Sequence, residues 1–469
     1  MKNNVDKWKD RRQEEQERRK VYKRALVLAV PMMVQNGITN AVGLVDNVMV
    51  GSLGTESMTA VSIAGQLFFV FFLAIFGGLS GPGIYSTQYF GQGNIEGVKS
   101  VFRLKWWIAL CCLLVGTVIF LLWGNDLLSL YLQGQAEGID AAATLHYGRQ
   151  YMLIMLLGLP PMVVTQIYAN TLRETGESMK PMVAAVCSVV ADICFNYLLI
   201  YGKFGLPRLE VRGAAVATVI ARVVEMCVIV LWAHCGKEKY AFLQQVYRSM
   251  KVPASMAVTI LKKGLPIFFN EFLWAGGMAV MTQCYSIRGL TVVAGLTISN
   301  ALCNMLNVVF IAMGNAVGIL SGQMLGASEY EKAKRDSVRL MWFTGGMSLL
   351  LTLILIGGSG VFPLLYDTTA RVRHYGTMFI VITAIFFPLQ GFLNALYFTL
   401  RSGGKTVITF LFDSMYTWVI SVPAAYLLCR HSVLPIIVVF TLVQSLDFIK
   451  VIVGYVLIKK GVWMNNLVA

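Results

Sequence analysis

Long, almost uncharged blocks of apolar residues are the feature of this sequence that most constrains its fold. Between Ala25 and Val50 the only charged residue is Asp46, and several other blocks are of similar length. A helix needs roughly 20 apolar residues to cross a bilayer. Of the 469 residues, 57% are hydrophobic and 13% are charged, whereas soluble domains carry about 25% charged residues. The sequence therefore predicts an all-α membrane protein.

Charged or Gly- and Pro-rich breaks divide the apolar blocks into twelve candidate transmembrane helices. We place them at residues 25–49, 58–83, 103–123, 150–170, 181–201, 213–234, 260–284, 291–320, 338–361, 375–399, 406–428 and 434–458. This division predicts four regions along the chain. They are a basic tail (1–24), an N-lobe of helices 1 to 6 (25–234), an inter-lobe linker (235–259) and a C-lobe of helices 7 to 12 (260–469).

The placement of basic residues predicts the orientation of the chain. Ten of the 39 Lys and Arg residues lie in residues 2–24, a segment that is typical of a solvated tail or an amphipathic surface helix. If the N-terminus is cytoplasmic, the cytoplasmic segments hold 30 Lys and Arg residues and the outer segments hold 8. This asymmetry is the positive-inside pattern. We expect both termini in the cytoplasm of a bacterial-type inner membrane, and we expect the net charge of +15 to face the bilayer rather than nucleic acid.

Short sequence matches at nearly one offset indicate an internal repeat. The matched pairs are Leu172–Gly176 with Leu400–Gly404, Gly91–Gln92 with Gly322–Gln323, and Pro31 with Pro266. Six spans in each half give both halves the same orientation, so the repeat is parallel, with an axis along the membrane normal. Two such lobes can rock around a cleft, which favours a secondary transporter.

Other classes of membrane protein lack support in the sequence. A channel would be expected to carry a filter of carbonyls or charged rings, and none is present. The nine Cys and four His residues show no metal-binding spacing, and no catalytic constellation lies within the spans. We therefore expect a protein that is not an enzyme and that has no resident cofactor.

The first half of the chain holds the strongest candidates for a functional site, because an ionisable residue within a span is costly unless it is paired or hydrated. Asp46 is one such residue. Asp192 and Asn196 are spaced i, i+4, so they share one face of a helix. With Thr218, these residues would offer several oxygen ligands to a proton or to a hard cation such as Na⁺. The alternative is that they only form hydrogen bonds between helices.

Candidates in the second half are more dispersed. Glu271 stands five residues after Pro266, and its repeat counterpart is Asn36. A carboxylate there could pair with a cationic substrate or a proton, or it could bridge helices. Asp413 is a weaker candidate. Two further pairs, Arg222 with Glu225 and Asp447 with Lys450, are spaced i, i+3 and would neutralise themselves locally.

Motifs spread over nearly the whole chain resemble those of the multidrug and toxic compound extrusion (MATE) family. They are Pro31, Val45–Gly54, Gln88–Gly93, Leu172–Gly176, Asn196–Gly202 and Gly213–Thr218, in the family's order. The resemblance implies a twelve-helix, two-lobe exporter. Such exporters are driven by Na⁺ or H⁺ and exchange the ion for organic, often cationic, compounds.

The resemblance also implies roles for single residues. Asp46 matches the carboxylate of the family's first helix, and Thr218 matches the threonine that lines the N-lobe cation site. Asp192 and Asn196 occur in the reverse of the family's order, which shifts the carboxylate by about 6 Å along the helix.

In the C-lobe, Gln390 takes the place of the family's tenth-helix Asp, and Glu271 lies nearly one turn before the family's Glu position. The resemblance therefore favours ion coupling through the N-lobe. We group Gln390 and Asn394 with Glu271 and Asn36 as candidates for binding substrate or a proton.

These observations predict a cation-coupled antiporter that exports drug-like organic compounds by alternating access and functions as a monomer. The alternative is a flippase or exporter of lipid-linked or polar metabolites with a related two-lobe build. The few charges within the spans disfavour that alternative.

Overall fold

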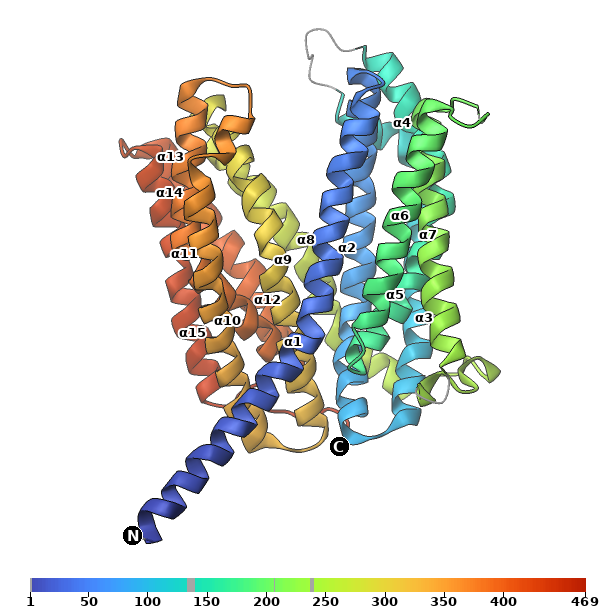
Figure 1. Ribbon diagram of the computed structural model, residues 1–469. Coiled ribbons are helices and arrows are strands. Elements are labelled where there is room, and N and C mark those ends of the chain that lie inside the picture. Colours follow the sequence, from blue (N-terminus) through green and yellow to red (C-terminus); the bar gives the residue numbers. More distant parts are fainter. Residues whose placement is uncertain (1, 133–139, 206, 237–239) are drawn as a thin grey trace. The chain divides into compact units, whose positions relative to one another are not determined.

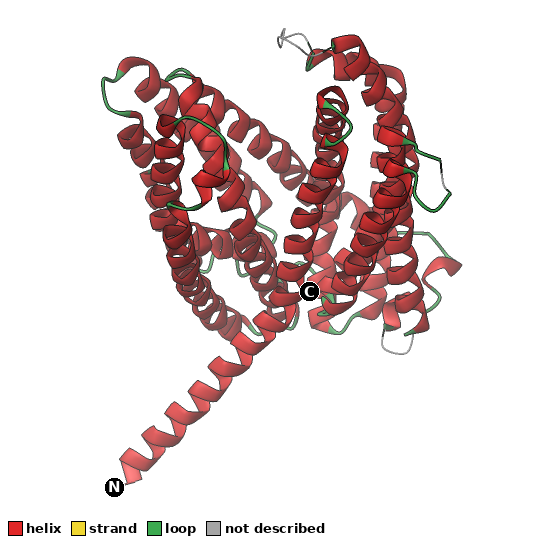
Figure 2. Ribbon diagram, turned by 45° about the horizontal axis from the view of Figure 1, so that its top comes forward, coloured by secondary structure: helices red, strands yellow, loops and turns green. Residues whose placement is uncertain are grey.

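The computed structural model describes residues 2–132, 140–205, 207–236 and 240–469, and throughout this part of the chain the protein consists of helices joined by short loops (Figures 1 and 2). Residues 237–239 of the predicted linker lie outside the described residues. Helices satisfy every backbone hydrogen bond within one segment, so a chain built from them can cross hydrocarbon without exposing unpaired polar groups.

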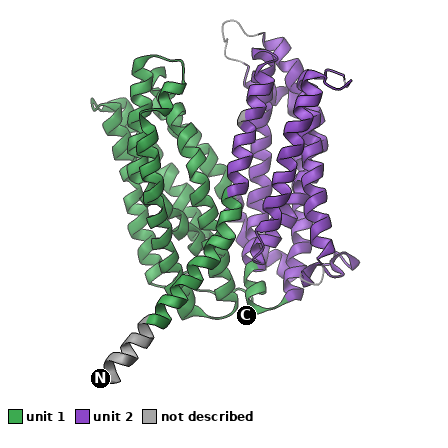
Figure 3. Cartoon of the chain, in the orientation of Figure 1, with its two compact units in different colours: residues 1–33, 87–94, 269–469 green, residues 34–86, 95–268 purple. Residues whose placement is uncertain are grey.

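The chain forms two compact units (Figure 3). Unit 1 comprises residues 1–33, 87–94 and 269–469, and unit 2 comprises residues 34–86 and 95–268. The limits of the units therefore fall inside helices rather than in the linker. The predicted lobe limits follow the linear repeat instead, and they stay a prediction.

Unit 2 takes most of its helices from the first half of the chain. These are the later part of α1 (Lys2–Gly51), most of α2 (Thr55–Gln92), α3 (Ile95–Leu130), α4 (Ala141–Met155), η1 (Leu156–Gly158), α5 (Leu159–Glu174), α6 (Met179–Tyr201), α7 (Glu210–Cys235), η2 (Ala241–Leu243), η3 (Val246–Arg248) and the start of α8 (Ala254–Ser286). One predicted span, 150–170, is α4, η1 and α5 in series, with a short 3₁₀ turn just before Pro160 and Pro161. Proline lacks the amide that would continue a regular helix at that point.

Unit 1 takes most of its helices from the second half of the chain. Besides parts of α1, α2 and α8, these are α9 (Leu290–Gly326), α10 (Tyr330–Ser359), η4 (Phe362–Leu365), α11 (Ala370–Ser402), α12 (Thr406–Phe410), the π-helical η5 (Leu411–Met415) and η6 (Thr417–Ser421), α13 (Val422–His431), α14 (Ile436–Ser445) and α15 (Asp447–Lys459). The predicted span 406–428 contains the two π-helical segments. Such segments are frequently found at functional sites.

Ten of the twelve predicted spans fall within one helix or within consecutive helices, while 338–361 and 434–458 each extend two residues beyond the observed helices. Eleven spans in the described part of the chain are long and apolar enough to cross a membrane. The remaining predicted span is in α8, a helix of 33 residues that carries Asn270 and Glu271 near its middle. These two polar side chains lower the mean hydropathy of α8, which explains why it is not among the eleven apolar spans.

The basic N-terminal segment is continuous with the first span, because α1 runs without a break from Lys2 to Gly51. Its extension is held within unit 1 by ion pairs to α10, from Glu14 to Arg339 at 2.5 Å and from Glu17 to Arg335 at 2.8 Å. Exposed ion pairs of this kind contribute little each, about 0 to 1 kcal/mol.

Three helices, α1, α2 and α8, contribute residues to both units. Each carries a proline a few residues before the position at which the chain passes from one unit to the other. Pro31 precedes the change in α1 at residues 33 and 34, and Pro82 precedes the change in α2 at residues 86 and 87. Pro266 precedes the change in α8 at residues 268 and 269. Proline inside a helix is a common cause of a bend.

Two glycines allow the ends of α2 and α9 to cross closely within unit 1. A Cβ atom added at Gly326 would overlap the carbonyl oxygen of Gln88, and one added at Gly91 would overlap that of Gln323. The C-terminal residues pack beside this crossing, where the Leu467 amide donates to Gln88 Oε1 at 2.7 Å. The Gly91 and Gly322–Gln323 motifs therefore serve close helix packing.

We predict that Gly326→Ala lowers the melting temperature of the purified protein in detergent, because the new methyl group must push a backbone carbonyl away. Overpacking of this kind costs about 1–3 kcal/mol. The matched control is Gly346→Ala, at a helical glycine whose added Cβ meets nothing within 4 Å. The control should be neutral or stabilising, and equal melting temperatures for the two variants would show that the crossing tolerates a side chain.

Candidate functional site

Asn196 joins two carboxylates in the interior of unit 2. Its Nδ2 atom donates to Asp46 Oδ1 at 2.8 Å and to Asp192 Oδ2 at 3.3 Å. Asn196 is 1% exposed and Asp192 is 6% exposed, while Asp46 is half-buried. The structure thus brings together Asp46, near the end of α1, with the i, i+4 pair of α6.

Neighbouring helices complete the surroundings of these carboxylates. Thr218, on α7, interacts with Asp192, and its hydroxyl also donates to the Ala214 carbonyl at 3.1 Å within its own helix. Tyr151, a buried residue of α4, lies beside Thr218 and interacts with both carboxylates. The site therefore draws side chains from α1, α4, α6 and α7. A contact between Ser52 and the Tyr201 hydroxyl at 3.1 Å fixes the end of α1 against α6.

Two oxygen atoms of the site have no hydrogen-bond partner within the described part of the chain. They are Asp192 Oδ1 and Asn196 Oδ1, and both are buried. Leaving a buried acceptor unsatisfied costs about 1–3 kcal/mol. A bound proton or a small hard cation would satisfy such acceptors, because carboxylate, amide and hydroxyl oxygens are the ligands that hard cations prefer.

The site lacks the features of a transition-metal centre. Among the residues that the structure describes, no group of three or more His, Cys, Asp and Glu side chains could hold a metal ion. An oxygen-only set of two carboxylates, an amide and a hydroxyl suits a hard cation rather than a soft transition metal.

Arg222 lies one helical turn beyond Thr218 and interacts electrostatically with both Asp46 and Asp192. Its Nη1 atom is also 3.4 Å from Glu225 Oε2. The pair that the sequence predicts to be self-neutralising therefore also contributes positive charge to the carboxylate site.

A second polar cluster lies in unit 1 around Asn270. The Nδ2 atom of Asn270 donates to Asp413 Oδ2 at 3.0 Å and to the Tyr397 hydroxyl at 3.2 Å. Ser414 donates to Asn270 Oδ1 at 2.6 Å. Asp413 and Ser414 belong to the π-helical segment η5. The next residue of α8, Glu271, faces Arg401 with 4.0 Å between Oε1 and Nη1.

Among the described residues, Gln390, Asn394 and Asn36 form no hydrogen bond with this cluster, although Asp413 interacts electrostatically with Asp447 and Lys450. Gln390 donates to Asp447 Oδ2 at 2.7 Å, and Lys450 lies 3.6 Å from the other oxygen of the same carboxylate. The Oδ1 atom of Asn394 is buried without a hydrogen-bond partner in the described residues. Asn36 is half-buried in unit 2, whereas its repeat counterpart Glu271 belongs to unit 1.

Comparison with known proteins identifies the family. A model of the MatE family matches residues 31–198 and 266–427, which together make up more than half of the chain. The chain belongs to the MatE family. Among curated relatives of this MatE protein, "Probable multidrug resistance protein YoeA" of Bacillus subtilis is 26% identical over 421 residues, covering 89% of each chain. "Probable multidrug resistance protein NorM" of Thermotoga maritima is 22% identical over 418 residues, covering 88% of this chain and 86% of the relative.

Solved structures share the fold of this MatE protein. The Vibrio cholerae MATE transporter VcmN aligns with a TM-score of 0.84 at 18% identity, covering 96% of this chain and 99% of that one. A multidrug resistance MATE family transporter in an outward-facing conformation aligns with a TM-score of 0.81 at 19% identity, covering 94% and 96%. The predicted family and the all-α, multi-helix membrane fold are therefore confirmed, and the protein is a membrane transporter rather than an enzyme.

Several polar residues of this MatE protein escape prediction from the sequence. Lys105 is fully buried, and its Nζ atom donates to Thr171 at 3.0 Å and pairs with Glu174. Asn270 and Tyr397 likewise find their partners on other helices. For the pair of Lys105 with Glu174, the sequence offered one indication, a Lys inside the predicted span 103–123. Its partner is revealed only by the packing of α3 on α5.

We predict that Asn196→Ala lowers the melting temperature, because it removes the donor shared by Asp46 and Asp192 and leaves two carboxylates facing each other. The expected cost is about 1–3 kcal/mol. Differential scanning fluorimetry in detergent would measure it. Asn40→Ala, at an exposed position of α1, should stay within about 0.5 kcal/mol of the wild type, and a similarly small effect at Asn196 would contradict the bridging role.

Proposed function

We propose that this transporter is an antiporter that exports drug-like organic, often cationic, compounds in exchange for Na⁺ or H⁺. The observation that carries the proposal is the Asp46–Asn196–Asp192 cluster, where two buried oxygen atoms lack a hydrogen-bond partner among the described residues. Curated relatives named as probable multidrug resistance proteins support the choice of substrate class.

Binding of the coupling ion is assigned to Asp46, Asp192, Asn196 and Thr218. One positive charge taken up there neutralises one carboxylate and satisfies the unpartnered oxygens. Asp46 lies on α1 and Asp192 lies on α6. An ion that binds between these two carboxylates reduces the repulsion between them, and the repulsion returns when the ion leaves. A transporter of this kind works only if substrate and ion favour different states, since a ligand can shift an equilibrium only by its differential affinity.

The arrangement of the chain in the membrane is part of the proposal. Both termini lie in the cytoplasm of a bacterial-type inner membrane, and the protein works as a monomer. The tail (1–24), N-lobe (25–234), linker (235–259) and C-lobe (260–469) are its functional parts. The excess of Lys and Arg in the segments assigned to the cytoplasm supports this orientation.

We predict that Asp46→Asn strongly reduces ion-driven export. The amide keeps the size of the side chain but removes its charge, so the coupling ion has less to neutralise. Efflux of a fluorescent organic cation from proteoliposomes would be measured under an imposed Na⁺ gradient and, separately, under a pH gradient. One of the two gradients should drive efflux by the wild type. Under that gradient the efflux rate of the variant should be lower by about tenfold or more, and a tenfold ratio corresponds to about 1.4 kcal/mol.

The matched control is Asp367→Asn, at an exposed loop position, which should transport as the wild type does. Normal efflux by Asp46→Asn would mean that this carboxylate is structural. If neither gradient drives efflux by the wild type, export of organic cations is wrong, and lipid-linked or polar metabolites become the substrates to test.

Glu271→Gln should act on the substrate rather than on the ion. Glu271 faces Arg401 in unit 1 and does not belong to the Asp46 cluster. We expect the variant to raise the KM for a cationic substrate while efflux keeps the same dependence on the driving gradient. Loss of the gradient dependence in this variant, measured in the same proteoliposomes, would instead place ion coupling in the C-lobe.

A further inference from the structure

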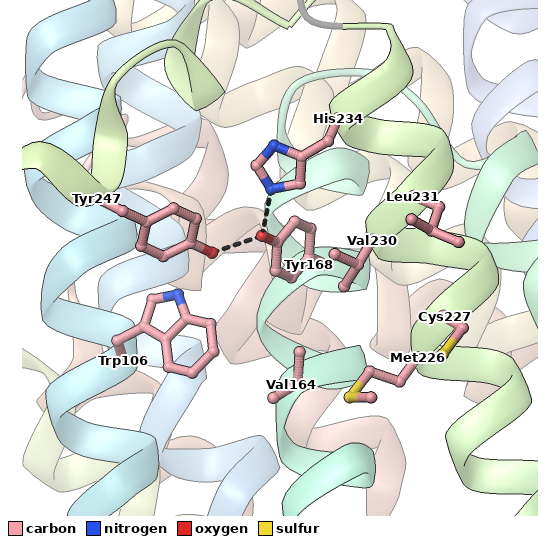
Figure 4. A pocket seen from close by; sticks show the side chains of 9 residues that line it. All are labelled: Trp106, Val164, Tyr168, Met226, Cys227, Val230, Leu231, His234 and Tyr247. Atoms are coloured by element: carbon pink, nitrogen blue, oxygen red, sulfur yellow. Dashed lines mark hydrogen bonds between the residues drawn. The ribbon is translucent and has the colours of Figure 1, made fainter.

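A pocket of about 380 Å³ opens between α3, α5 and α7 of unit 2, apart from the carboxylate site (Figure 4). Its apolar surface comes mainly from aliphatic side chains of α5 and α7, with an aromatic wall opposite. The lining residues are Trp106, Val164, Tyr168, Met226, Cys227, Val230, Leu231, His234 and Tyr247. None of the nine is acidic, so the pocket offers no counter-charge to an organic cation.

Hydrogen bonds hold the aromatic end of the pocket in place. The Tyr168 hydroxyl lies 2.8 Å from His234 Nε2 and also forms a hydrogen bond with the Tyr247 hydroxyl (Figure 4). These three residues come from α5, α7 and η3. The pocket is therefore built by the linker as well as by the membrane helices.

The linker is fixed to α3 on the other side of the pocket. Arg103 Nε donates to the Val246 carbonyl at 2.9 Å, and Trp107 Nε1 donates to the Met250 carbonyl at 3.0 Å. The exposed residues Arg248 and Lys251 belong to this attached stretch of the linker, and Arg248 directly follows Tyr247, which lines the pocket. Two positive charges are thus carried by the stretch of linker that holds the aromatic end of the pocket.

The pocket lies beside an exposed apolar face of α7. On α7 the residues Val223, Cys227 and Leu231 form an exposed stripe, with Leu231 63% exposed. Exposed apolar side chains of a membrane-spanning helix are solvated by acyl chains. Trp106 and Trp107 lie in the first half of α3, close to the start of the predicted span 103–123, and tryptophan is enriched at the membrane–water interface.

We propose that this pocket binds one anionic phospholipid of the bilayer, with an acyl chain between α3 and α7 and its headgroup at Arg248 and Lys251. The bound lipid joins the linker to the membrane helices. Charge selects the lipid, since clusters of basic residues beside a membrane helix attract anionic headgroups.

Native mass spectrometry of the full chain in detergent tests the proposal. Phosphatidylglycerol and phosphatidylcholine with identical acyl chains would be titrated separately. We expect a single tightly held phosphatidylglycerol, bound in preference to phosphatidylcholine. The double variant Arg248→Gln with Lys251→Gln should reduce this preference by roughly fivefold for each charge removed.

Cys227→Trp should fill the pocket and abolish the single lipid adduct, whereas Val223→Trp, one turn away on the same exposed stripe but outside the lining, should retain it. Thermal unfolding would verify that both variants are folded. Equal binding of the two lipids, an adduct that survives in folded Cys227→Trp, or displacement of the lipid by an organic cation would overturn the proposal. Should Cys227→Trp not fold, the selectivity of the charge variants decides alone.

Discussion

The bilayer offers no hydrogen-bond partner to a polar group in its interior, and the polar clusters of this protein follow from that constraint. Each unit contains a buried amide that serves several oxygens at once. Asn196 donates to two carboxylates in unit 2, and Asn270 donates to a carboxylate and a phenol in unit 1. An amide suits this task because it carries both donor and acceptor atoms.

The two clusters differ in how completely they are satisfied. Asp413 lies beside Asn270 in a network closed by Tyr397 and Ser414, whereas the cluster in unit 2 leaves Asp192 Oδ1 and Asn196 Oδ1 without a protein partner in the described residues. A fully satisfied network rigidifies helix packing, whereas unsatisfied buried acceptors are costly, and a bound ion would remove that cost. This asymmetry supports coupling through unit 2 despite the internal repeat.

Sequence patterns revealed the class and fold of the protein because apolar block length follows from bilayer thickness. They also revealed that Asp192 and Asn196 share a helix face, since i, i+4 spacing is local. They could not reveal that Arg222 acts electrostatically on the same carboxylates or that Lys105 meets Glu174, because those interactions depend on which helices pack together. The unit limits inside α1, α2 and α8 were beyond reach for the same reason.

The prolines of these three shared helices have a mechanical consequence. Pro31, Pro82 and Pro266 each leave one carbonyl, a turn earlier, without its usual amide partner. A helix can bend at such a point without breaking a hydrogen bond that it never had. Rigid helices shared by two bodies would lock them together. The missing bond beside each unit limit makes α1, α2 and α8 easier to bend there than elsewhere along their length.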